Sequence, residues 1–208
     1  MNETEKLLTE LKDIRSIMER SSRFLSLSGL SGILIGIYAL TGAFIAHRIL
    51  YFNIPFPASI DFKSDTVIQL FIVGILVLII SLFTVFLLTV KKARKEQKPI
   101  WGTGSRLLLF NLLIPLVTGG FLILILIYRG YYSVISPGFL IFYGLALVNA
   151  AKYTRPEILG MGLIEIVLGL IAALFPGYGL YFWAFGFGIL HIVYGFVYLK
   201  YESKNKLK

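Results

Sequence analysis

Residues 154–201 read TRPEILGMGLIEIVLGLIAALFPGYGLYFWAFGFGILHIVYGFVYLKY, and this stretch decides the fold. Two apolar runs, 158–175 and 180–199, lie on either side of the turn sequence Pro-Gly-Tyr-Gly at 176–179. Each run approaches the length of about 20 residues that an α-helix needs to cross a hydrocarbon core of roughly 30 Å. The stretch therefore predicts a hairpin of two membrane-spanning helices.

Each helix of this predicted hairpin carries one ionisable side chain where hydrocarbon is expected. Glu165 lies 11 residues before Pro176, and His191 lies 12 residues after Gly179. At roughly 1.5 Å per residue, both side chains are about 17 Å from the turn and so at the same depth. Because a lone charge in hydrocarbon costs several kcal/mol, we expect Glu165 and His191 to form an intramembrane polar pair through a direct or water-bridged hydrogen bond.

The whole chain continues this apolar pattern. It has 208 residues, of which 57% are hydrophobic, and long stretches with few or no charges follow one another. We predict an all-α membrane protein whose six transmembrane helices are arranged as three hairpins, because helices satisfy their own backbone groups in lipid. The predicted spans are 24–46, 67–90, 107–128, 134–151, 158–175 and 180–199.

The basic residues are distributed unevenly between the two sides of these spans. Seventeen lie in the termini and in the second and fourth connections, whereas only Arg48, Lys63 and Arg129 lie on the other side. The positive-inside rule therefore predicts cytoplasmic termini and, for a bacterial protein, insertion in the inner membrane. The net charge of +9 is explained by this topology and by anionic lipids at the cytoplasmic face rather than by nucleic acid.

The segments outside the spans define the remaining domain organisation. Residues 1–23 predict a cytoplasmic amphipathic helix, because apolar side chains recur at spacings of four, three and four among charges. Residues 24–201 form the predicted transmembrane domain, and residues 202–208 a basic cytoplasmic tail. The periodic apolar residues are Leu7, Leu11, Ile14 and Met18.

The first predicted span contains a packing seam of small residues at spacings of three and four. Such a seam lets two helix backbones approach closely, which is how helices associate in lipid. Two interpretations stay open, namely packing inside the bundle and contact between copies in a homo-oligomer. The seam consists of Gly29, Gly32, Gly36, Ala39, Ala43 and Ala46.

The connection at 91–106 is strongly basic, and we expect a flexible loop that faces the lipid headgroups. Its Gly102-Thr103-Gly104 sequence lacks the Gly-Lys-Ser/Thr ending of a phosphate-binding loop. The basic residues at its start are Lys91, Lys92, Arg94 and Lys95.

The third span contains a proline. Pro115 removes the hydrogen bond to the carbonyl group of Asn111, and Thr118 with two glycines follows it. We therefore predict a helix break at Asn111, Pro115 and Thr118.

A weak internal repeat relates two segments of the chain. Residues 138–153 align without gaps with residues 186–201 at an offset of 48. Both segments begin with Gly-Phe, share one isoleucine and end with Lys-Tyr. The repeat suggests that the helical hairpins run in a parallel sense.

The C-terminal hairpin also resembles a known family. Its run at 160–169, the Pro176-Gly177 turn, Gly188 and Gly195 are similar to the two-helix repeat of HdeD-like acid-resistance membrane proteins. The resemblance covers about the last quarter of the chain. It implies three hairpins with six spans and a stress-linked protein of the inner membrane. The long connections at 47–66 and 91–106 depart from the family pattern.

No arrangement of residues in the sequence is typical of an enzyme. The chain has no cysteine, and His47 and His191 are expected at different depths. Neither histidine stands at the Glu-x-x-His or His-x-x-x-His spacing of a helical metal site. We therefore expect no enzymatic activity, no metal and no cofactor.

Two functional hypotheses remain. In the first, the chain is a non-enzymatic multi-pass membrane protein with a structural, stress-related or assembly role. In the second, it is a small proton-linked transporter or channel that uses Glu165 and His191, because ionisable residues inside a membrane are functional candidates. Access of water to Glu165 is the feature that discriminates between the two hypotheses.

Overall fold

A computed structural model describes residues 28–51, 64–97, 100–155 and 157–205, and every regular element in these ranges is helical. Six helical segments are long and apolar enough to cross a membrane, which confirms the predicted number of spans. The first five spans correspond to α2, α3, α4, α5 and α6, and the sixth consists of α7, the π-helix η2 and α8. Their bounds are α2 Gly29–Tyr51, α3 Ser64–Lys95, α4 Thr103–Tyr128, a short 3-10 turn η1 Tyr132–Val134, α5 Ile135–Ala151, α6 Glu157–Leu174, α7 Gly179–Trp183, η2 Ala184–Leu190 and α8 His191–Asn205.

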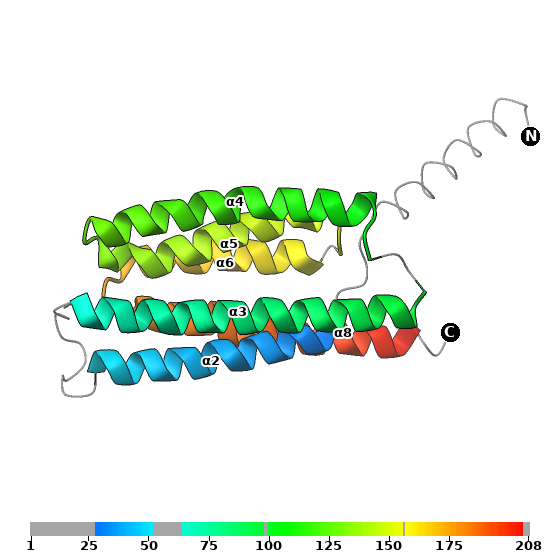
Figure 1. Cartoon of the computed structure of the whole chain (residues 1–208), viewed down its shortest axis with the longest axis horizontal. Helices are drawn as coiled ribbons and strands as arrows, with labels where there is room; N and C mark the ends of the chain where they lie inside the picture. The colour runs from blue at the N-terminus through cyan, green and yellow to red at the C-terminus, as the bar shows by residue number, and fades with distance from the viewer. Residues whose placement is uncertain (1–27, 52–63, 98–99, 156, 206–208) are drawn as a thin grey trace, which may run out of the picture.

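The spans form two groups of three (Figure 1). In one group α5 lies between α4 and α6, and in the other α2 packs against α3 and against α8. The first half of the sixth span joins the groups, because α7 contacts α5 and α6 while η2 contacts α2. The closest partner of α6 is α5 rather than the sixth span. The arrangement as three hairpins stays a prediction.

Small residues bring the helix backbones together within both groups. A methyl group added to Gly36 of α2 would lie 2.5 Å from the Gly188 carbonyl oxygen, and one added to Gly29 would lie 2.8 Å from that of Gly195. The packing seam of α2 therefore faces the sixth span of the same chain. Gly144 of α5 makes an equivalent approach to α6. The other seam residues Ala39, Ala43 and Ala46 are buried.

Two predicted irregularities are absent from the described helices. The α3 helix continues to Lys95, so Lys91, Lys92, Arg94 and Lys95 belong to its last turns and the prediction of a loop for them is wrong. Lysine and arginine are good helix formers, and their charges interact favourably with the C-terminal end of the helix dipole.

The predicted helix break is also wrong. The α4 helix runs through Pro115 without interruption, and Thr118 lies exposed on its surface. The Asn111 amide donates to the Leu107 carbonyl oxygen at 2.8 Å, one turn before the proline. Transmembrane helices tolerate proline because side chains and small local adjustments compensate for the lost bond.

Some predictions concern residues outside the described ranges. The amphipathic helix expected at 1–23 lies outside them, as does the end of the basic tail at 206–208. The first part of that tail, up to Asn205, continues the α8 helix.

The orientation of the bundle is a testable prediction of the charge distribution. Reporter fusions after Lys208 and within residues 57–63 should lie on opposite sides of the membrane, with Lys208 in the cytoplasm. A topology reporter active on only one side measures this in intact cells. Equal signals from both fusions would contradict the odd number of crossings between them and the predicted orientation.

Candidate functional site

Glu165 lies midway along α6, and its side chain is completely buried. Its carboxyl group rests on Gly186 of η2, where the missing side chain makes room for it: a methyl group on Gly186 would collide with Glu165 Oε2. The Leu140 side chain of α5 packs against the same glycine. Neither carboxyl oxygen has a hydrogen-bond partner among the residues that the structure describes. The helical segments α5, α6 and η2 thus enclose a carboxyl group that forms no hydrogen bond with the described residues.

His191 begins α8 and is also buried. Its Nδ1 lies 3.1 Å from the Gly186 carbonyl oxygen, and its Nε2 lies 2.7 Å from the hydroxyl oxygen of Tyr143 on α5. A carbonyl oxygen only accepts, so Nδ1 carries the hydrogen and donates it. In a neutral imidazole, Nε2 is then the acceptor of the Tyr143 hydroxyl hydrogen.

The direct form of the predicted hydrogen bond between Glu165 and His191 is therefore wrong, and its water-bridged form stays a prediction. The structure brings both side chains to Gly186, but both imidazole nitrogens bond to other groups. The prediction assumed a regular α-helix over 180–199, whereas residues Ala184–Leu190 form a π-helix. Its wider turns change the rotational phase of the residues that follow, including His191.

Tyr143 is the member of this site that the functional reasoning from sequence missed. Its ring stacks on His191 with centroids 5.4 Å apart and contacts Phe187 at 4.8 Å. A signal was present in the internal repeat, because position 143 aligns with position 191 at the offset of 48. The two equivalent positions of the repeat are the ones that share the hydrogen bond.

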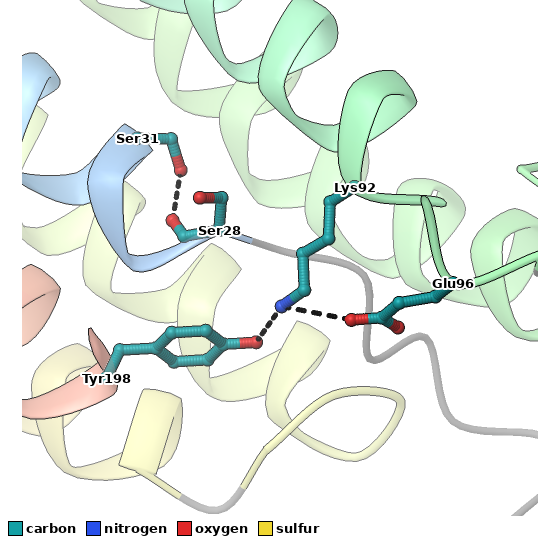
Figure 2. Close-up of polar contacts among 5 residues, drawn as sticks. All are labelled: Ser28, Ser31, Lys92, Glu96 and Tyr198. Carbon is teal, nitrogen blue, oxygen red and sulfur yellow. Dashed lines mark hydrogen bonds and ion pairs between the residues drawn. The ribbon is translucent and has the colours of Figure 1, made fainter. Parts of the chain in front are cut away.

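A second polar cluster ties α3 to α8 at the basic end of the bundle (Figure 2). Lys92 of α3 donates to the Tyr198 hydroxyl of α8 at 3.3 Å and forms an ion pair with Glu96 at 3.9 Å. The Arg155 guanidinium, just before α6, lies 4.5 Å from the centre of the same Tyr198 ring. Of the four basic residues predicted to face lipid, Lys92 is thus half-buried in protein contacts, while Lys91, Arg94 and Lys95 are exposed.

The other histidine, His47, is far from Glu165 and His191 along the chain and contacts different residues. His47, near the end of α2, bonds through Nε2 to the Tyr181 hydroxyl of α7 at 3.1 Å. The Tyr51 ring lies beside it, tilted by 44°, and the Tyr51 hydroxyl donates to the Gly177 carbonyl oxygen at 3.4 Å. These contacts fasten the end of α2 to the turn before the sixth span.

No protein-family model, curated protein or solved structure matches this chain. The likeness of the C-terminal hairpin to HdeD-like proteins consequently stays a prediction.

Proposed function

We propose that this protein is a small proton-linked transporter or channel in which Glu165 binds the proton. The observation that carries the proposal is the Glu165 carboxyl group, fully buried midway along a membrane-spanning helix and without a hydrogen-bond partner in the described ranges. Ionisable residues inside membranes mark proton and ion pathways in pumps and transporters, and each is a functional candidate by default.

The cost of this arrangement argues against a purely structural role for Glu165. An unsatisfied buried polar group destabilises a protein by about 1–3 kcal/mol, and an ionised one by more. A structural glutamate would recover this cost through a hydrogen bond to a neighbouring helix. Its carboxyl oxygens lack such a bond among the described residues, although His191 and Tyr143 are bonded to each other nearby.

The surroundings of Glu165 also favour a functional site. The π-helix η2 passes directly over the carboxyl group through Gly186, and π-helical turns occur frequently at functional sites. The Tyr143–His191 pair next to it offers one hydroxyl and one imidazole, the groups that most often hand protons on.

Glu165→Gln tests the proposal. The amide has nearly the same shape as the carboxyl group but cannot release a proton, so we expect a folded protein that no longer carries protons. Purified protein in liposomes with an internal pH dye measures proton uptake under an imposed pH gradient. Glu157→Gln, the same change at the first turn of α6, is the matched control and should keep parental uptake. Equal uptake by parent and Glu165→Gln would refute the proposal.

A structural, stress-related or assembly role in the bacterial inner membrane is the second candidate, and α3 favours it. Only 6% of an apolar 18-residue stretch of α3 is buried within the described part of the chain, whereas 39% of the corresponding stretch of α2 is buried. Such a helix offers a long apolar surface to lipid, to a partner helix or to a second copy of the chain. The exposed residues Lys91, Arg94 and Lys95 at its end would then meet anionic headgroups of the cytoplasmic leaflet.

A further inference from the structure

We propose that Tyr143 is the positioning residue of the Glu165 site: its hydroxyl donates to Nε2 of the neutral His191 imidazole and keeps that hydrogen bond when the imidazole takes up a proton. The role in proton movement rests on the proposed function. The hydrogen-bond arrangement itself can be tested without any transport activity.

The first step concerns the direction of the hydrogen bonds. The Gly186 carbonyl oxygen forces the hydrogen of a neutral imidazole onto Nδ1, and the Tyr143 hydroxyl then donates to Nε2. The stacked Tyr143 and Phe187 rings hold the imidazole plane in place, with the Phe187 and His191 planes only 15° apart. Two hydrogen bonds and two ring contacts therefore determine one tautomer and one orientation.

The second step concerns protonation. An imidazolium donates from both nitrogens, so its partners must both be acceptors. The Gly186 carbonyl oxygen already is one, and a tyrosine hydroxyl becomes one by rotating its hydrogen away from Nε2. His191 can thus gain a proton without losing either hydrogen bond. A phenylalanine at position 143 would remove this adaptable partner.

The third step connects the pair to Glu165. The carboxyl group of Glu165 and the Nδ1 of His191 both lie against one residue, Gly186. When a proton leaves Glu165, its O–H bond breaks and an N–H bond forms at His191 Nε2. Neither carboxyl oxygen is hydrogen-bonded to Tyr143 in the described structure, so this transfer requires the carboxyl group to rotate into hydrogen-bond contact with the Tyr143 oxygen. The Tyr143 oxygen then gives its own hydrogen to Nε2 and receives the one from the carboxyl group. A neutral pair becomes an ion pair with zero net charge, which costs less in a low dielectric than an isolated carboxylate.

The titratable groups that face this site come from three helices. They are Tyr143 of α5, Glu165 of α6, and His191 and Tyr194 of α8. From the remaining neighbour, α2, Gly32 packs against the backbone of His191. Tyr194 differs from Tyr143 in that its hydroxyl has no hydrogen-bond partner within the described segments.

Nitrogen-15 NMR of histidine-labelled protein tests the proposal. The chain has two histidines, so the His47→Gln background leaves His191 as the single labelled imidazole. We expect a protonated Nδ1 and a hydrogen-bonded, unprotonated Nε2 at neutral pH. Tyr143→Phe should shift the Nε2 resonance to that of a nitrogen without a hydrogen bond, and should lower proton uptake by up to about tenfold, the factor that one hydrogen bond supplies.

Tyr194→Phe is the matched control, since it also deletes a hydroxyl but should leave the His191 spectrum unchanged. A hydrogen on Nε2 instead of Nδ1 in the His47→Gln protein would overturn the proposal even if Tyr143→Phe did not fold. So would a Tyr143→Phe spectrum identical to that of its parent. Absence of proton uptake by the parent protein would refute the proposed function, whereas the Nε2 resonance would still decide the role of Tyr143.

Discussion

Gly36→Leu should cause a large loss of stability, on the order of 3 kcal/mol or more, by forcing α2 away from the sixth span. The first carbon of a new side chain would lie 2.5 Å from the Gly188 carbonyl oxygen and 3.0 Å from the Ile192 backbone nitrogen. Both atoms belong to a helix backbone, so neither can rotate out of the way. Close backbone contact is itself the source of helix association in lipid, and the substitution removes it.

The same substitution at neighbouring positions gives a graded comparison. At Gly32 the nearest atom to an added carbon is 3.1 Å away, so Gly32→Leu should cost about 1–3 kcal/mol. At Gly74 of α3 no described atom outside its own helix lies within 4 Å, so Gly74→Leu should change stability by less than about 0.5 kcal/mol. Denaturation in detergent, followed by tryptophan fluorescence, measures all three. A Gly36→Leu protein that unfolds like the Gly74→Leu protein would refute the described packing of α2.

Glu165→Met should raise stability by about 1–3 kcal/mol while abolishing proton uptake. Methionine is unbranched and of similar length, so it fits the space against Gly186 without leaving a buried polar atom unsatisfied. A gain in stability coupled to a loss of function is typical of residues retained for activity. Denaturation of the two proteins under identical detergent conditions measures the change.

His191→Met provides the contrast in the same part of the bundle. It removes two hydrogen bonds and leaves the Tyr143 hydroxyl without its imidazole partner, so it should lower stability by about 1–3 kcal/mol. The opposite signs separate the two functional hypotheses. If Glu165→Met lowers stability as His191→Met does, then Glu165 stabilises the bundle. That result would favour the structural hypothesis over the transport hypothesis.

The sequence by itself determined the features that depend on local composition. Each span is a long, mostly apolar run, and a lipid environment requires such a run to be helical whatever its neighbours are. The spacing of Gly29, Gly32 and Gly36 likewise placed them on one face, because helical periodicity is a local property. The burial of Glu165 and His191 followed from their positions inside apolar runs.

Only the tertiary structure decided which groups meet. The π-helix at Ala184–Leu190 turned His191 toward Tyr143, a residue 48 positions away on another helix. It also decided that the α2 seam packs against the sixth span and that the carboxyl group of Glu165 rests on Gly186 without a hydrogen bond. The physical reason is that partners depend on the rotation and neighbours of whole helices. Close packing between distant segments sets both, and no local pattern encodes them.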